Sequence, residues 1–135
     1  LGYGDPRVLH SFPTRPSSDQ SQGRYEEAEP LYVQSLELSR KLLGEDHPSV
    51  ATSLNNLAAL YYGQGRYKEA EPLYVQAIAI LFNRLGQDHP NTKAVFNNFC
   101  QFITTVLAEE KQNELSDHPL TQSIIEQLRA QNSQE

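Results

Sequence analysis

Apolar residues recur along most of this chain at intervals of three, four and seven, the spacing of one face of an α-helix. The clearest example is the segment 48–63, which Asp46-His47-Pro48 opens and Gly63 closes. Proline suits the first position of a helix, and Asp46 or His47 is expected to supply the cap in front of it. The stripe expected to be buried on this helix consists of Ala51, Leu54, Leu57, Ala58 and Tyr61.

The same periodicity predicts four further helices, at 24–43, 67–85, 90–107 and 120–130. Gly44 and Gly86 are expected to end two of them, because glycine readily takes the left-handed conformation that closes a helix. The expected apolar faces are Ala28, Leu31, Tyr32, Leu36, Leu42 and Leu43 on the first, Phe96, Phe99, Cys100, Ile103 and Leu107 on the third, and Ile124, Ile125 and Leu128 on the last.

The chain also repeats itself. Residues 23–34 return almost unchanged at 65–76, an offset of 42, and Asn55-Asn56 returns at the same offset as Asn97-Asn98. A fixed period of this size is typical of stacked helical repeats, so the predicted fold is all-α, with repeats over 23–107. Asp117-His118-Pro119 then restates the helix opening much earlier than the period requires. Residues 108–135 are therefore predicted to be a capping helix followed by a frayed tail.

Residues 1–22 do not follow the repeat. The period would place a helix in front of Gly23, but this segment contains Pro6, Pro13 and Pro16, each of which opposes a helix. Phe12, Arg15 and Asp19 stand at the positions of the apolar Leu54, Leu57 and Tyr61. We expect 1–22 to be a disordered or non-native N-terminal segment without function, the alternative being a native flexible tail.

Composition narrows the functional classes. The chain of 135 residues has a net charge of −6 and shows no basic face, which argues against nucleic acid as a partner. Its apolar runs fall short of a membrane span, so we expect no membrane partner. A single cysteine, Cys100, suits a reducing compartment, and a cytoplasmic location is expected.

These helix pairs resemble tetratricopeptide repeats, because small and aromatic residues fall at the family's positions: Leu54, Leu57, Ala58, Tyr61, Gly65, Tyr67, Ala70, Tyr74 and Ala77. The 42-residue length, the Asp-His-Pro opening and the run 53–62 are similar to the kinesin light chain type of repeat. The resemblance implies an α-α superhelix (a solenoid) that acts as a non-catalytic scaffold for protein–protein interaction. It also makes 48–63 and 90–107 the first helices of their pairs, and 24–43 a second helix that lacks its first.

Other chemistry has weaker support. Gly63-Gln64-Gly65-Arg66 follows a helix and lacks the Lys-Ser/Thr of a phosphate loop. His47, His89 and His118 occupy equivalent positions in successive units, too far apart to share a metal, so capping and loop packing is the better explanation. Cys100 is the counterpart of Ala58 and is expected to be a buried, inert thiol. No enzyme, cofactor or metal is predicted.

The remaining candidate is a surface that binds a peptide or a partner helix, which the resemblance places on the concave face formed by the first helices. The predicted peptide-binding residues are Thr52, Asn55, Asn56, Tyr62, Asn97, Asn98 and Gln101. An asparagine amide both donates and accepts hydrogen bonds, as a bound peptide backbone requires. In the alternative, one asparagine of each pair bonds a neighbouring helix or loop.

A rival hypothesis is self-association. A helix at 24–43 without a first helix before it is expected to leave Leu31, Tyr32 or Leu36 partly uncovered, and exposed apolar patches promote association. A homodimer through 24–43 is the alternative function.

Overall fold

The computed structural model describes the backbone of residues 19–133 and the side chains of residues 24–131. Within this range it contains α-helices and one short 3-10 turn but no β-strand. The elements are α2 (Asp19–Leu43), α3 (Pro48–Gly63), α4 (Tyr67–Leu85), α5 (Pro90–Ala108), η2 (Gln112–Glu114) and α6 (Pro119–Ser133). The predicted all-α class is confirmed, and four of the five helix starts lie within one residue of their predicted positions.

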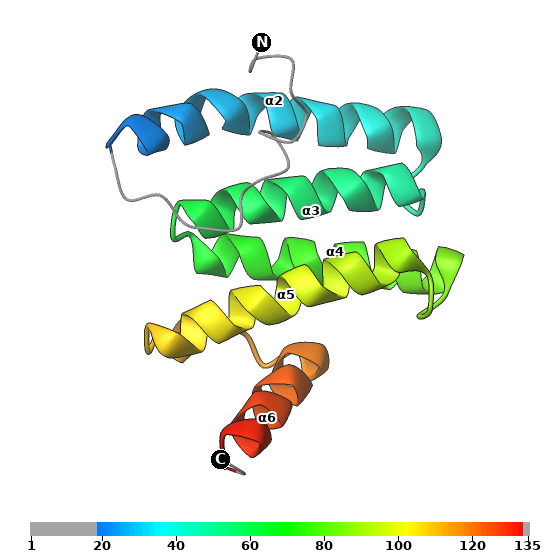
Figure 1. The fold of residues 1–135 in the computed structure, drawn as a ribbon. Helices are drawn as coiled ribbons and strands as arrows, with labels where there is room; N and C mark the ends of the chain where they lie inside the picture. Colours follow the sequence, from blue (N-terminus) through cyan, green and yellow to red (C-terminus); the bar gives the residue numbers. More distant parts are fainter. Residues whose placement is uncertain (1–18, 134–135) are drawn as a thin grey trace.

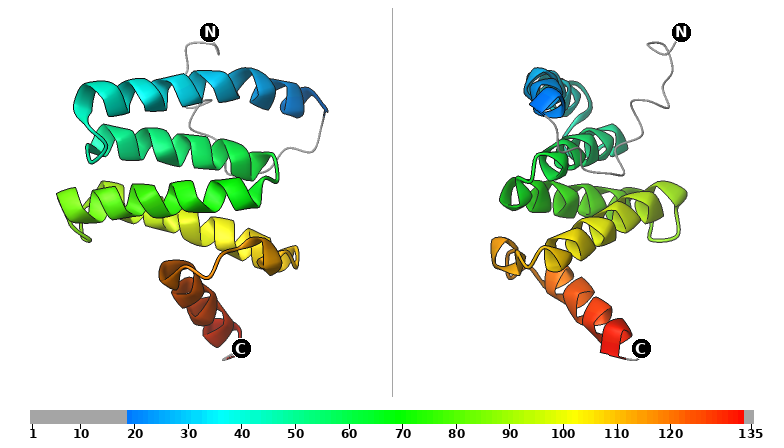
Figure 2. Two further views of the ribbon diagram at one scale, coloured as in Figure 1. Left: turned by 180° about the vertical axis from the view of Figure 1, so that it is seen from behind. Right: turned by 60° about the vertical axis from the view of Figure 1, so that its left-hand side comes forward.

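The helices form a stack in chain order, with α2 at one end and α6 at the other (Figure 1). α2, α3 and α4 lie side by side, and their short connections make neighbouring helices antiparallel. α5 packs across α4, and α6 is steeply inclined to the helices before it (Figure 2). α3 and α4 make the most extensive contact, whereas α6 meets α5 over a small area.

The Asp-His-Pro motif caps each helix that it opens. The imidazole Nδ1 of His47 accepts from the backbone N–H of Ser49 at 3.0 Å. His89 caps α5 in the same way through Asn91, and His118 caps α6 through Leu120, both at 3.1 Å. Each ring nitrogen thus satisfies one of the first N–H groups of a helix, which have no partner inside the helix. The prediction that these histidines are caps is confirmed for all three.

Aromatic rings fill the centre of the stack, between α4 and α5. Tyr67, Tyr74, Phe99 and Phe102 are almost completely buried. The ring of Phe102 lies 5.2 Å from that of Tyr74 and 5.7 Å from that of Tyr67, measured between centroids. Tyr62 closes the cluster at its edge, with its ring 5.7 Å from that of Phe102. These contacts hold α5 against the α3–α4 pair.

The apolar stripes are confirmed on α3 and α6 and need correction on α5. Ala51, Leu54, Leu57, Ala58 and Tyr61 are all buried, as are Ile124 and Ile125, with Leu128 half-buried. On α5 only Phe99 and Ile103 of the predicted face are fully buried. The buried face is shifted round the helix and includes Val95, Phe102 and Val106, which the prediction missed. Of these, Phe102 packs against Tyr67 and Tyr74 of α4.

α2 departs most from the prediction. It begins at Asp19, before the predicted start at Arg24, and so runs through Gly23, whose counterpart Gly65 has a φ of 78° in the turn between α3 and α4. Residues 19–22, assigned to the N-terminal segment, are therefore helical, and residues 1–18 lie outside the described residues.

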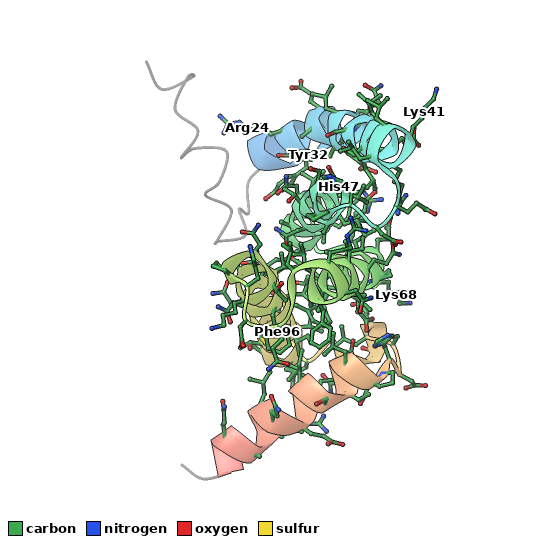
Figure 3. All side chains as sticks on the ribbon, turned by 90° about the vertical axis from the view of Figure 1, so that its right-hand side faces the viewer. Arg24, Tyr32, Lys41, His47, Lys68 and Phe96 are labelled. Atoms are coloured by element: carbon green, nitrogen blue, oxygen red, sulfur yellow. The ribbon has the colours of Figure 1, made fainter. Side chains whose placement is uncertain are left out.

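The buried side of α2 is also narrower than predicted. Leu36 is buried and Tyr32 half-buried, but Leu31, Leu42 and Leu43 are 65%, 69% and 49% exposed. Figure 3 shows Tyr32 on the side of α2 that faces α3, with Lys41 projecting away from the stack. Among the described residues, α3 is the main packing partner of α2 and contacts one side of the helix.

Candidate peptide-binding face

α3 and α5 lie beside each other along one face of the stack, and two pairs of side chains join them. The Nδ2 atom of Asn98 donates to Oδ1 of Asn55 at 3.4 Å. Seven residues further along both helices, the hydroxyls of Tyr62 and Thr105 are 2.6 Å apart. Both pairs are separated by 43 residues, so α3 and α5 run parallel in a constant register.

Four of the seven predicted binding residues are exposed next to these bridges. They are Thr52 and Asn56 on α3, and Asn97 and Gln101 on α5. The other three, Asn55, Tyr62 and Asn98, are half-buried in the bridges themselves. One asparagine of each pair thus bonds the neighbouring helix, as the alternative interpretation held, and the other faces outward. The binding role of all seven residues stays a prediction.

The surface formed in this way, which we call the amide face, is uncharged. It consists of Thr52, Asn55, Asn56, Ala59 and Tyr62 on α3, and Asn97, Asn98, Gln101, Thr104 and Thr105 on α5. The threonine hydroxyls bond back to their own helices, for example Thr52 to the carbonyl of Pro48 at 3.3 Å. The outward amides of Asn56, Asn97 and Gln101 are therefore the exposed groups that can both donate and accept.

A cleft of about 410 Å³ adjoins the amide face and was not predicted. It lies between the end of α4, the start of α5 and the first turn of α6, and its lining residues are Ile78, Phe82, Gln87, Thr92, Lys93, Phe96, Asn97 and Leu120. Figure 3 places Phe96 on the side of α5 nearest α6. The sequence contains one sign of this cleft, because the aromatic Phe82 stands where the first copy has Arg40. In the structure Phe82 is 51% exposed.

Two equivalent glutamates, Glu29 and Glu71, fix the helices that carry these surfaces. Glu29 accepts from Tyr61 at 3.1 Å and from Arg66 at 2.7 Å, joining α2 to α3 and to the turn after it. Burial raises the pKa of Tyr61, and the Glu29 carboxylate beside it acts in the same direction. These contacts belong to the scaffold, because they tie one helix to the next and leave the amide face untouched.

Cys100 is half-buried rather than fully buried like its counterpart Ala58. The difference follows from the shifted packing of α5, which turns this position toward the edge of the core. Burial still raises the pKa of its thiol, so the reactive thiolate is disfavoured. Among residues 24–131, no three His, Cys, Asp or Glu side chains lie close enough to hold a metal.

Comparison with known families gives a match to the tetratricopeptide repeat over residues 17–82, which spans α2, α3 and α4 up to Phe82. With the antiparallel helix pairs described above, this match makes the chain a tetratricopeptide repeat protein. It remains a prediction that α3 and α4 form one complete repeat, with α2 as the second helix of the repeat before it and α5 as the first helix of the repeat after it. The kinesin light chain type remains a prediction.

Tetratricopeptide repeats form a non-catalytic family whose members are generally protein–protein interaction modules. The match begins inside the segment 1–22, at residue 17. None of the helices that the structure describes has an apolar stretch that could cross a bilayer.

Proposed function

We propose that this protein binds a peptide or a partner helix of another protein across the amide face. The observation that carries the proposal is the composition of that face. In a chain in which 21% of the residues are charged, a surface spanning two helices presents amides, hydroxyls and a small residue instead. Such a surface suits the neutral, alternating donors and acceptors of a peptide backbone.

The two kinds of asparagine are assigned different roles. Asn56, Asn97 and Gln101 are exposed and contact the partner directly. The Asn55–Asn98 and Tyr62–Thr105 pairs keep α3 and α5 at a fixed separation. They form the floor of the surface on which the partner lies. A preorganised floor lowers the entropy lost when a peptide binds. A non-catalytic role in the cytoplasm is part of this proposal.

The test begins with peptides selected from a random display library on the purified protein. Their affinity is then measured by calorimetry for the wild type and for the triple variant Asn56→Ala/Asn97→Ala/Gln101→Ala. Three lost hydrogen bonds of about 0.5–1.5 kcal/mol each predict affinity at least tenfold weaker, with an unchanged melting temperature. Gln34→Ala, which removes an exposed amide from α2, is the matched control. Equal affinity of the triple variant and the wild type refutes the proposal.

A second candidate function is self-association through α2. Leu31, Leu38 and Leu42 are 65%, 56% and 69% exposed. With Ala28 and Ser35 they fall at alternating spacings of three and four, the pattern of a helix–helix seam. Four of the five counterparts on α4 are used in packing, because Ala70 and Ala77 are completely buried and Leu73 and Ile80 pack against the core. The fifth, Arg84 in place of Leu42, is exposed.

We infer that a second copy of this chain covers the α2 seam in an antiparallel arrangement. Glu27, Gln34 and Lys41 follow one edge of the seam, with opposite charges at its two ends. When two copies of α2 run antiparallel, Glu27 of each copy comes beside Lys41 of the other. The surface is thus complementary to itself, as a two-fold interface requires.

A further inference from the structure

The cleft between α4, α5 and α6 has an apolar floor and one buried polar group that lacks a partner. Ile78, Phe96 and Leu120 provide apolar walls, and Phe82 stands at the rim with half its surface exposed. Thr92 also lines this space, it is only 4% exposed, and its buried Oγ1 makes no hydrogen bond. Buried hydroxyls are normally satisfied, so this one calls for an explanation.

The repeats show that the fold does not need a hydroxyl at this position. Thr92 is the second residue after the proline that opens α5, and the same position holds Val50 in α3 and Thr121 in α6. Val50 is completely buried without a polar atom. The Thr121 hydroxyl donates to Glu71 at 2.6 Å. Of these three residues, only Thr92 combines an unpaired buried hydroxyl with a place in the wall of a cavity.

We propose that this cleft is a pocket for one large apolar side chain, leucine or phenylalanine, of a partner peptide. Oγ1 of Thr92 has almost no exposed surface in the free chain. When the peptide binds, the Thr92 side chain rotates about its Cα–Cβ bond and its hydroxyl donates to the backbone carbonyl next to the bound side chain, while Phe82 and Phe96 pack against that side chain. A volume of about 410 Å³ admits a side chain of this size with its adjoining peptide group. Lys93 and Asn97 at the same cleft add donors for the peptide oxygens.

The cleft is continuous with the amide face, because Asn97 belongs to both. This continuity favours a peptide over an isolated small molecule as the occupant. The peptide backbone crosses the amide face and its apolar residue enters the cleft. The inference therefore deepens the proposed function and rests on it, since it names the anchor of the same partner.

Capped single residues test the pocket without a known partner. N-acetyl-leucine methylamide carries an apolar side chain and peptide carbonyls, and the glycine compound carries the carbonyls alone. In nuclear magnetic resonance titrations of the whole chain, the leucine compound is expected to shift the backbone amides of Thr92, Phe96 and Leu120 and to saturate. The glycine compound is expected to leave these amide resonances unshifted. Equal responses to both compounds overturn the proposal.

Two variants assign the contacts. Thr92→Val copies Val50, so the fold tolerates it, and the loss of one neutral hydrogen bond predicts leucine-probe binding about five- to tenfold weaker. Phe82→Ala alters an exposed residue and is expected to weaken binding by a similar factor, whereas Leu38→Ala, an exposed leucine on α2, leaves it unchanged. Unchanged affinity in Thr92→Val refutes the hydroxyl's role.

The triple variant of the amide face separates this inference from the proposed function. It is expected to bind the leucine probe as wild type does, apart from a small effect of Asn97, while losing affinity for selected peptides. If the chain binds the leucine probe but no selected peptide, the pocket is supported and the peptide-binding function is refuted. If selected peptides bind, and neither Thr92→Val nor Phe82→Ala changes their affinity, the pocket is refuted and the peptide-binding function stands.

Discussion

The carboxylate of Glu71 accepts a hydrogen bond from the hydroxyl of Thr121 at 2.6 Å, across 50 residues of chain. The same buried carboxylate accepts from the backbone N–H and the hydroxyl of Ser116, at 2.8 and 2.6 Å. Because α6 meets α5 over a small area, these three bonds from α4 do much to set the position of α6. They also set one wall of the cleft, since Leu120 lies next to Thr121.

Replacing Glu71 with alanine is expected to release α6. The variant leaves the Ser116 N–H and two hydroxyls without their acceptor, which predicts a loss of about 2–4 kcal/mol of stability. Hydrogen exchange is expected to rise throughout α6 more than in α3 or α4. Glu126→Ala, an exposed site on α6 itself, is the matched control and should change neither measurement. Normal protection of α6 in the Glu71 variant would contradict this role.

Leu38→Glu is expected to convert a dimer to a monomer, because it places a charge in the middle of the α2 seam. Sedimentation velocity of the wild type and the variant at high micromolar concentration measures this directly. Phe82→Glu adds the same charge at another exposed apolar residue and should leave the dimer intact. A monomeric wild type would rule out self-association at this surface.

The antiparallel arrangement of the two α2 helices is tested by exchanging the charges of Glu27 and Lys41. Glu27→Lys is expected to weaken the dimer by bringing like charges together, and the double variant Glu27→Lys/Lys41→Glu to restore it. Exposed pairs of this kind contribute little, about 0.2–1 kcal/mol each, so the change in dissociation constant is expected to be a few-fold and smaller at high salt. A double variant no stronger than the single one would indicate another geometry.

Cys100 is expected to react slowly with iodoacetamide at neutral pH. Burial raises the pKa of its thiol, so the thiolate fraction at a given pH is lower in the folded chain than in the unfolded one. The alkylation rate should increase in urea, and in the folded protein it should rise only at higher pH than for a free thiol. Equal rates in folded and unfolded protein would show that the raised pKa is incorrect.

Acid is expected to weaken the turn between α3 and α4. Arg66 donates to both oxygens of Glu69, at 2.9 and 2.6 Å, and this bond lowers the pKa of the carboxyl group. A lowered folded-state pKa means stability that is present above about 4.5 and lost as the pH falls through the folded value. Urea unfolding at pH 7 and pH 3 should differ less for Glu69→Gln than for the wild type. The effect is small, because Glu69 is half-exposed.

The repeat period and the Asp-His-Pro motif were sufficient to predict most helix boundaries and all three histidine caps, because these depend on local sequence. The start of α2 was not predictable in the same way. A glycine can be a turn or an ordinary helical residue, and Gly65 is held in its turn by α3 packing back on α4. No helix among the described residues does this for Gly23.

The amide face was predicted only in part for a similar reason. Periodicity placed Asn55 and Asn98 on the outer sides of their helices, but their mutual bond depends on how closely α3 and α5 approach. The cleft is harder still to predict from local sequence patterns, because its walls come from three helices and the position of α6 depends on Glu71. Only the aromatic Phe82 at a surface position gave a sign of it in the sequence.

The central claim is that a partner peptide lies across α3 and α5. Its most direct test follows the side-chain amide resonances of Asn56, Asn97 and Gln101 by nuclear magnetic resonance while a display-selected peptide is added to the whole chain. We predict that these three signals shift together and saturate with one affinity, while that of Gln34 on α2 stays in place. Saturable shifts confined to α2 or to the far side of α4, with these three amides unmoved, would contradict the account.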